Sequence, residues 1–193
     1  MKTILISLKI FLVMTILTGV IYPLFVTVIG QTIFYNHSNG SMIVVNNKTV
    51  GSELIGQKFV GIQYFNSRPS AINYNPMPSG ASNLSVTSKE LQLRVKRNIA
   101  SFDSINQIPT SQSIPSEMIY ASGSGLDPHI SPQAALMQVN RICKSRHLPE
   151  TAVKQIEDLI SHSTEGRQLG FLGEKRINVL KLNLELDKYF IVR

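Results

Sequence analysis

The feature that most constrains this chain is a long uncharged stretch close to its N-terminus. No Asp, Glu, Lys or Arg occurs between Ile10 and Asn47, and 17 of the 25 residues from Ile10 to Phe34 are hydrophobic. A helix rises about 1.5 Å per residue, so roughly 20 apolar residues cross the hydrocarbon layer of a bilayer, which is about 30 Å thick. We therefore predict one N-terminal transmembrane helix over about residues 10–30, within a membrane anchor of residues 1–34.

A cleaved signal peptide is the alternative to an anchor. Lys2 and Lys9 precede the apolar stretch, as basic residues precede the apolar core of a signal. However, the stretch is about twice the length of such a core, and no Ala-x-Ala-like cleavage site follows it. Val28-Ile29-Gly30 is the best small-residue candidate. We favour the uncleaved anchor.

Charge asymmetry predicts the orientation of this helix. Lys2 and Lys9 lie before it, whereas the first charged residue after it is Lys48. Positive charge is retained on the cytoplasmic side of a membrane, so we expect the N-terminus in the cytoplasm. Residues 35–193 then form a single extracytoplasmic domain on a single-pass membrane protein.

The charge of the chain gives no sign of a nucleic-acid partner. There are 19 Lys and Arg against 12 Asp and Glu, a net charge of +7, and the basic residues are scattered. The dense spots, Lys96-Arg97 and Lys144-Ser145-Arg146, lack the interleaved aromatic residues on which single-stranded nucleic acids stack. We interpret these basic residues as solvated surface.

Local patterns predict an α+β fold for the domain. Residues 42–45 and 49–50 are expected to pair as a hairpin around the turn 46–48, and residues 114–122 are expected to be extended. From residue 180 to residue 186, leucine alternates with polar residues, which is typical of a strand with one buried face.

Two helices are predicted from their N-terminal signals. Thr87 with Glu90 three residues later matches a capping box, and apolar residues recur at helical spacing up to Phe102. Ser131-Pro132 is an N-cap residue followed by proline at the first helical position, which predicts a helix through residues 134–144.

A third helix is predicted over residues 150–162, with Gly166 as its stop. Cys143 is the only cysteine, so no disulfide can form within the chain. It falls in the second predicted helix, where we expect it to pack as a small apolar residue.

Residues 66–87 are rich in Ser, Asn, Pro and Gly, and Arg68 is the only charged residue among them. Tyr74, Met77 and Leu84 supply apolar side chains that a pure linker would lack. We therefore expect an ordered, functional loop rather than a flexible tether.

No catalytic or metal-binding pattern stands out in the sequence. Gly123 and Gly125 lack the Gly-Lys-Ser/Thr that completes a phosphate loop, and the four histidines have neither the H-E-x-x-H pattern nor the paired spacing of a zinc site. Asp127-Pro128-His129 could pair a carboxylate with an imidazole, but it precedes the N-cap Ser131 and is expected to be a turn. We expect no catalytic residue and no metal site.

Several longer motifs point to one family. They are Arg68-Pro69-Ser70-Ala71, Tyr74-Asn75-Pro76, the stretch from Ser79 to Leu84, the stretch from Ala121 to Ala135, and the stretch from Asn178 to Asp187. In this order they resemble the C subunit of the Kdp potassium-transporting P-type ATPase. The resemblance runs from the N-terminal anchor to Asp187.

The resemblance implies a non-catalytic accessory subunit of a complex that imports potassium with high affinity across the bacterial plasma membrane at the expense of ATP. A channel-like subunit would bind the ion, a P-type subunit would hydrolyse ATP, and this chain alone would bind no cofactor. Its partners would be those two subunits and membrane lipid. The family is described as a catalytic chaperone that raises the nucleotide affinity of the P-type subunit. A membrane-anchored extracytoplasmic enzyme or binding module is the alternative.

The predicted orientation conflicts with direct contact between the domain and ATP, because the membrane separates them. Either the effect on the P-type subunit passes through membrane helices, or the domain acts mainly at the ion entrance. Both possibilities stay open at this point.

Two stretches of these motifs are candidates for contact with partner subunits. The first contributes Arg68, Pro69, Ser70, Tyr74, Asn75, Ser79, Gly80 and Asn83. The second contributes Ser122, Gly123, Ser124, Gly125, Asp127, Pro128 and His129. Its glycines and its proline favour a tight loop that exposes the main chain. We hypothesise that this loop contacts the channel-like subunit; the alternative is that it only joins a strand to a helix.

The predicted orientation can be tested with Asn39→Cys in a chain that also carries Cys143→Ser. We expect a membrane-impermeant thiol reagent to label the new cysteine in intact cells, because residue 39 follows a helix whose N-terminus is cytoplasmic. The Cys143→Ser chain without Asn39→Cys gives the background. Protection of residue 39 until the membrane is permeabilised would mean that the opposite orientation is correct.

Overall fold

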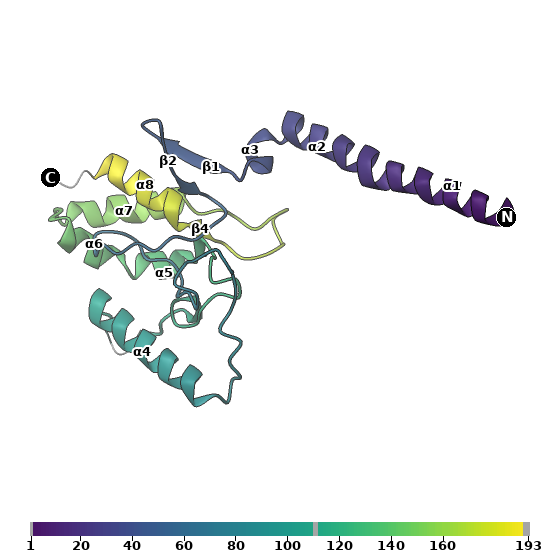
Figure 1. Cartoon of the computed structure of the whole chain (residues 1–193). Coiled ribbons are helices and arrows are strands. Elements are labelled where there is room, and N and C mark those ends of the chain that lie inside the picture. Colours follow the sequence, from purple (N-terminus) through teal and green to yellow (C-terminus); the bar gives the residue numbers. More distant parts are fainter. Residues whose placement is uncertain (1, 110–111, 191–193) are drawn as a thin grey trace. The chain divides into compact units, whose positions relative to one another are not determined.

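The computed structural model describes residues 2–109 and 112–190 of the chain (Figure 1). Two compact units are present, with the boundary between Ser52 and Glu53. Residues 1, 110–111 and 191–193, which fall in the predicted anchor and the predicted outer domain, lie outside the described residues.

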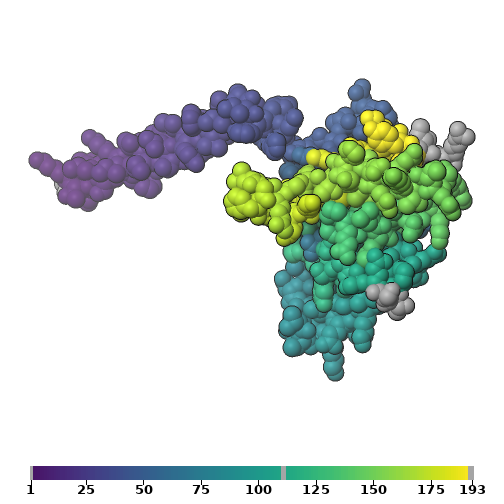
Figure 2. All heavy atoms as spheres, turned by 180° about the vertical axis from the view of Figure 1, so that it is seen from behind, coloured from purple at the N-terminus to yellow at the C-terminus, as the bar shows by residue number. Residues whose placement is uncertain are grey.

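The first unit contains one long apolar helix. It consists of α1 (Lys2–Ile16), the π-helical turn η1 (Leu17–Ile21) and α2 (Tyr22–Ile33). Together these 32 residues are long and apolar enough to cross a membrane. None of their side chains is buried within the chain, and Figure 2 shows them projecting along the purple helix. The prediction of a long N-terminal apolar helix is confirmed.

The π-helical turn ends at Ile21, two residues before Pro23. A proline has no N–H to donate, and its ring would clash with the carbonyl four residues earlier, which is that of Gly19. A π turn contains one extra residue and relaxes this clash. The hydroxyls of Thr15, Thr18 and Thr27 each donate to the carbonyl four residues before them, at 2.7–2.8 Å, so these groups need no water.

After the short helix α3 (Tyr35–Ser38), strands β1 (Met42–Val45) and β2 (Lys48–Ser52) pair antiparallel. Asn46 and Asn47 form the turn with φ values of 49° and 59°. This left-handed conformation suits a two-residue hairpin turn, and Asn tolerates it better than most residues. The predicted hairpin is confirmed, although its second strand extends to Ser52 rather than ending at residue 50.

The second unit combines helices with a small sheet, which confirms the α+β class. Strands β3 (His129–Ile130) and β4 (Ile177–Asn178) pair antiparallel. The helices of this unit are α4 (Lys89–Asn106), the 3-10 helix η2 (Ser116–Met118), α5 (Pro132–Leu136), α6 (Val139–Ser145), α7 (Thr151–His162) and α8 (Val179–Tyr189). Helix α7 contacts α5, α6 and α8, whereas α4 lies to one side of them (Figure 1).

The helix predictions around Ser131 are confirmed in part. The Ser131 hydroxyl accepts a hydrogen bond from the N–H of Ala134 at 3.1 Å, and α7 ends at His162 as predicted. The predicted helix 134–144 is instead two helices, α5 and α6, because the chain leaves the helical path just before Gln138. The side chain of Gln138 is used for a tertiary contact described below.

Three further expectations concern the residues around these helices. Cys143 is buried in α6, as predicted, and burial raises the pKa of its thiol. Residues 114–122 are not extended throughout, because the 3-10 turn η2 follows Pro115. Gly166 does not end α7, whose C-cap is Ser163.

The first helix of the second unit begins one residue later than predicted. Ser88, not Thr87, is the N-cap, and its hydroxyl accepts from the N–H of Leu91 at 3.5 Å. Glu90 pairs with Arg94 at 3.1 Å instead of reaching back to the cap. Adjacent Thr and Ser are both good caps, so the sequence alone does not separate them.

The predicted strand over residues 180–186 is wrong, because these residues belong to α8. Leu182 and Leu186, four positions apart, have no exposed surface and lie on one helical face. Asn178 caps the helix by accepting from the N–H of Lys181 at 3.1 Å. Leucines at every second position fit a strand, but they also include pairs four positions apart, which lie on one face of a helix. Here the N-cap and the packing in the core favour the helix.

The main chain of residues 62–66, which belong to no helix or strand, is held by side chains from the helices. Asn183 of α8 accepts from the N–H of Phe65 at 2.8 Å and donates to its carbonyl at 3.0 Å. Gln138 does the same to Asn66, at 2.8 and 3.3 Å. Each amide side chain therefore makes the two main-chain hydrogen bonds that a residue of a neighbouring β-strand would make in a sheet. We call this segment with its side-chain partners the 62–66 clasp.

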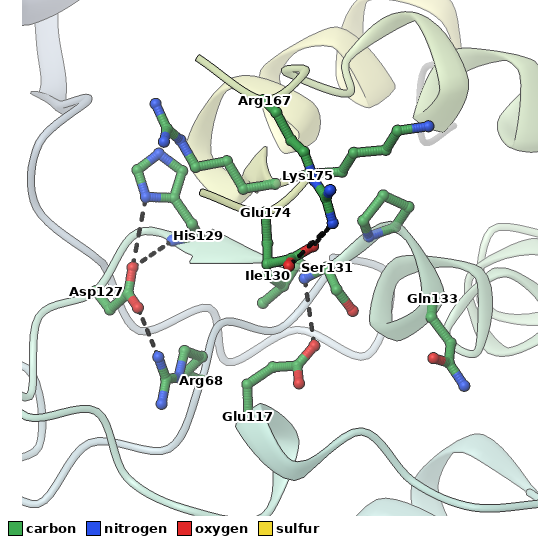
Figure 3. Close-up of a pocket in the computed structure, with 12 residues that line it drawn as sticks. Arg68, Glu117, Asp127, His129, Ile130, Ser131, Gln133, Arg167, Glu174 and Lys175 are labelled. Carbon is green, nitrogen blue, oxygen red and sulfur yellow. Dashed lines mark hydrogen bonds and ion pairs between the residues drawn. The ribbon is translucent and has the colours of Figure 1, made fainter. Parts of the chain in front are cut away.

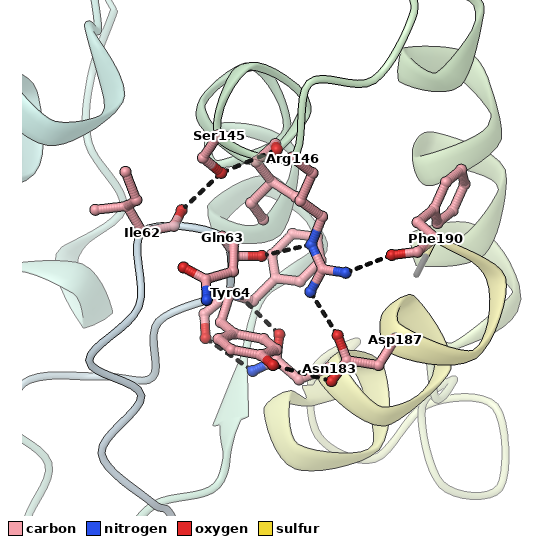
Figure 4. A network of polar contacts seen from close by, with 10 residues as sticks. Ile62, Gln63, Tyr64, Ser145, Arg146, Asn183, Asp187 and Phe190 are labelled. Carbon is pink, nitrogen blue, oxygen red and sulfur yellow. Dashed lines mark hydrogen bonds and ion pairs between the residues drawn. The ribbon is translucent and has the colours of Figure 1, made fainter. Parts of the chain in front are cut away.

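Two buried arginines complete the 62–66 clasp. One of them, Arg146, was predicted to be solvated surface, and that prediction is wrong because its side chain is buried among hydrogen-bond partners. Arg146 donates to the carbonyl of Gln63 at 2.9 Å, to that of Phe190 at 2.6 Å and to the Asp187 carboxylate at 2.7 Å (Figure 4). Its guanidinium also lies 5.1 Å from the centre of the Tyr64 ring. These partners compensate for the burial of the charge.

Arg141, which lies in α6, binds the same segment. It donates to the carbonyls of Ile62 and Tyr64, to Gln138 and to the side chain of Asn106. Burial lowers the pKa of Arg141 to about 10, so its guanidinium stays charged at neutral pH. Its donors therefore stay available to the main chain.

Replacing Asn183 by alanine should destabilise the protein strongly. The substitution leaves the N–H and the carbonyl of Phe65 buried without partners, which costs about 2–5 kcal/mol of unfolding free energy. Denaturant unfolding of the full chain in detergent measures this loss. Asn140→Ala is the matched control, because Asn140 is exposed on α6. Equal effects of the two substitutions would mean that the clasp does not hold the fold.

Candidate functional site

The two predicted contact stretches lie against each other in the second unit. The carbonyl of Pro69 accepts from the N–H of Ser122 at 3.2 Å, and the N–H of Gly80 donates to the carbonyl of Ser124 at 3.1 Å. These bonds join positions more than 40 residues apart in the sequence. We call residues 68–83 and 122–129 the paired loops.

Gly125 allows the paired loops to approach closely. Its φ is 70°, and a Cβ atom built there would lie 2.5 Å from a side-chain carbon of Ile72 and 2.9 Å from the carbonyl oxygen of Gly80. Both the backbone conformation and the contact therefore require glycine. Gly123, by contrast, faces open space and is exposed.

Asp127 connects the two loops through its carboxylate. One oxygen accepts from Arg68 at 2.8 Å, and the other accepts from the N–H of His129 at 3.0 Å and lies 3.5 Å from Nδ1 of its ring (Figure 3). Burial alone would raise the pKa of Asp127, but the hydrogen bonds from His129 and Arg68 outweigh it and lower the pKa to about 2. Asp127 therefore stays ionised at neutral pH.

The first of the paired loops is braced by its own side chains. The Tyr74 hydroxyl donates to the carbonyl of Arg68 at 2.5 Å, and the N–H of Tyr74 donates to the Ser70 hydroxyl at 2.9 Å. Burial raises the pKa of Tyr74 to about 12, so this hydroxyl keeps its proton. Asn75 accepts from the N–H of Met77 at 3.1 Å and forms the next turn.

The second of the paired loops is fixed to the core at its base. Pro128 is buried, and its carbonyl accepts from the N–H of Val179 at 2.9 Å, at the start of α8. The carbonyl of Leu126 accepts from the N–H of Gly56 at 2.7 Å. The loop therefore has a defined position.

Burial separates the predicted contact residues into three groups. Ser122, Gly125 and Pro128 are buried and serve the loop structure. The half-buried residues are Arg68, Pro69, Ser70, Tyr74, Gly80, Asp127 and His129. The exposed residues, whose side chains or main chain a partner could reach, are Asn75, Ser79, Asn83, Gly123 and Ser124.

A cleft of about 780 Å³ opens beside the paired loops. Arg68, Asp127 and His129 line one wall of it. Further lining residues, which the sequence interpretation did not select, are Glu117, Ser131, Arg167, Glu174, Lys175 and Arg176. The last four belong to a hairpin of residues 165–176. This hairpin lies within the C-terminal part of the family resemblance, so the resemblance could have identified these four residues as contact candidates.

Most charged groups in the cleft are already paired. Arg167 lies 2.9 Å from Glu174, and Glu117 accepts from the N–H of Ser131 at 3.4 Å. Among the described residues no group of three or more His, Cys, Asp or Glu could hold a metal ion. Nε of Arg68 is buried and has no hydrogen-bond partner in the described part of the chain. The arrangement suits recognition of a polar segment better than proton transfer, because Asp127 is a weak base.

Comparisons with known proteins were consistent with one another. The family model described as KdpC, K+-transporting ATPase, c chain, matches residues 4–188. A potassium-transporting ATPase KdpC subunit from Leptospira interrogans is 43% identical over 185 residues, which cover 96% of this chain and 93% of the relative. Relatives of the same name from Caldanaerobacter subterraneus and Methylococcus capsulatus are 44% and 46% identical and cover 93% and 94% of this chain, and 92% and 95% of their own length. The similarity therefore includes both units and the paired loops.

The ionisation of Asp127 predicts a pH-dependent contribution to stability. Its pKa of about 2 in the folded protein lies below the ordinary value of 3.8, so its stabilising effect is complete above about pH 4 and is lost as the pH falls toward 2. Asp127→Asn should therefore unfold at a lower temperature than the wild type at pH 7, and the difference should shrink between pH 4 and pH 2. Asp158→Asn, at an exposed position of α7, controls for the loss of one charge. A difference that does not change with pH would contradict the assignment.

Proposed function

Because this chain belongs to the KdpC family, the c chains of K+-transporting ATPases, we propose that it acts as a non-catalytic accessory subunit that stabilises an ATP-driven, high-affinity potassium import complex. Its proposed partners are a channel-like subunit that binds potassium and a P-type subunit that hydrolyses ATP. The observation that carries the assembly role is the pairing of the two loops, because one rigid surface is made from two distant motifs.

The paired loops have the properties of a preorganised contact surface. The ion pair between Arg68 and Asp127 and the main-chain bonds at Pro69 and Gly80 hold the loops in place without a partner. Exposed small polar side chains and main chain then remain for the partner. A surface that is already ordered loses little conformational entropy on binding.

The chemistry of the cleft supports a role other than catalysis. Asp127 is engaged by Arg68 and His129, and Glu174 is engaged by Arg167. The lowered pKa of Asp127 makes it a poor general base near neutral pH. We propose that ATP and potassium are handled by the partner subunits, and that this chain binds neither on its own.

The proposed orientation leaves one route by which this chain can affect the nucleotide. With the N-terminus in the cytoplasm and the second unit outside, the apolar helix Lys2–Ile33 is the part of the chain able to transmit an effect across the membrane. We propose that this helix packs beside the membrane helices of the partners and promotes nucleotide affinity or coupling in the P-type subunit. The second unit would act at the outer face of the channel-like subunit.

Ser79→Glu tests the proposed contact surface. Ser79 is exposed and directly precedes Gly80, which is bonded to the second loop, so the substitution should leave the fold intact but place a charge in the interface. We expect the recovery of both partner subunits with the tagged full-length chain to fall by on the order of tenfold, the effect of a change at the centre of an interface. Growth at limiting potassium should fall with it.

The control for this experiment is Ser161→Glu, which makes the same change at an exposed position of α7. It should leave both recovery and growth unchanged. Unaltered recovery with Ser79→Glu, in a chain with normal thermal stability, would remove the paired loops from the interface.

A further inference from the structure

The hairpin of residues 165–176 extends from the second unit and is held by main-chain bonds. Glu165 and Arg176 exchange two hydrogen bonds at 2.9 and 3.2 Å, and Gln168 and Leu172 exchange two at 2.9 Å. The corresponding yellow-green lobe projects from the body of the unit in Figure 2. The hairpin is therefore a defined protrusion.

The tip of this hairpin exposes large apolar side chains. Leu169 is 83% exposed, Phe171 is 71% exposed and Leu172 is 47% exposed. Leu169 also has a φ of 53°, a left-handed conformation that is uncommon for leucine. A contiguous apolar tip of this kind marks a site of interaction, because single exposed apolar residues are ordinary and clusters are not.

Basic residues lie at the base of the same hairpin. Arg167 pairs with Glu174 at 2.9 Å, and Arg176 pairs with Glu165 at 3.0 Å, so two ion pairs brace the arms. Lys175 adds a positive charge that has no ion-pair partner among the described residues. This arrangement matches the interfacial region of a bilayer. The apolar tip would contact acyl chains, and the basic residues at the base would lie at the level of the anionic headgroups.

We propose that the tip of the 165–176 hairpin inserts into the surface of the bilayer that holds the chain's own apolar helix, with Lys175 near anionic lipid headgroups. Leu169, Phe171 and Leu172 would enter the region between headgroups and acyl chains. This contact goes beyond the proposed assembly role, and it requires no partner subunit.

The covalent link to the apolar helix favours lipid as the occupant. Only residues 34–52 separate that helix from the second unit, at most roughly 70 Å even if fully extended. The bilayer is therefore always present at a high effective concentration, and a weak insertion of three side chains is enough for occupancy. The apolar tip consists of three side chains, whereas protein interfaces of standard size take about 20–30 residues from each partner.

Fluorescence quenching in lipid nanodiscs tests this proposal. Phe171→Cys in a Cys143→Ser full-length chain is labelled with an NBD fluorophore and reconstituted without partner subunits in phosphatidylcholine and phosphatidylglycerol. Nitroxide groups on the acyl chains close to the headgroups should quench the label roughly twofold or more, because interfacial segments reach this depth. Lys175→Glu should reduce the quenching.

Val86→Cys, labelled in the same way, is the control because Val86 is 84% exposed and lies outside the hairpin. It should show little quenching. Absence of quenching at residue 171, in a chain with normal thermal stability, would overturn the proposal. Shielding of residue 171 from aqueous iodide only after partner subunits are added would also overturn it, since the tip would then dock on protein. Recovery of the partners with Phe171→Cys reports on assembly separately.

Discussion

The second unit depends on the 62–66 clasp. Gln138 and Asn183 each bind both main-chain groups of one residue, and Arg141 and Arg146 bind the carbonyls around them. Helices have no free main-chain groups on their sides, so a segment packed between them must find its hydrogen bonds among side chains. The clasp meets this requirement. Removing one member leaves buried polar groups without partners, which is why polar residues occupy positions in the centre of an otherwise apolar core.

The clasp also fixes the main chain from which the first of the paired loops begins. Arg68 follows Asn66 by two residues, so the fixed main chain of Asn66 delivers the Arg68 side chain toward Asp127. The second loop is anchored independently, through Pro128, to the first turn of α8, which also carries Asn183. Both loops are therefore bonded to α8 close by: Phe65, just before the first loop, binds Asn183, and Pro128 of the second loop binds Val179. Loops without regular structure keep a defined geometry here because main-chain hydrogen bonds hold Asn66, just before the first loop, and Pro128, within the second.

The sequence predicted those features whose causes are local. The uncharged stretch before Lys48 specifies the apolar helix, Asn46-Asn47 specifies the hairpin turn, and Ser131-Pro132 specifies a helix start. The clasp could not be predicted, because it joins residues 62–66 to side chains more than 70 positions later. For α8, leucines at every second position fit two periodicities, and only the core shows that Leu182 and Leu186 share a face.

The candidate site shows the same division between local and distant information. The family resemblance covers the paired loops and the 165–176 hairpin, but we selected only the paired loops as contact candidates. The bonds between the loops, and the place of the hairpin in the lining of the cleft, were not predicted. In a catalytic site one expects a titratable group left partly unpaired, so that it can exchange a proton. Here Asp127 is held ionised by two partners, and its charge is used to fix the loops. The charge of Asp127 thus serves to hold the loops rigid. Other molecules can contact the shape of this region, its exposed main chain and the apolar tip of the 165–176 hairpin. These features suit the proposed role of the chain, in which it acts on a transport complex without taking part in its reaction.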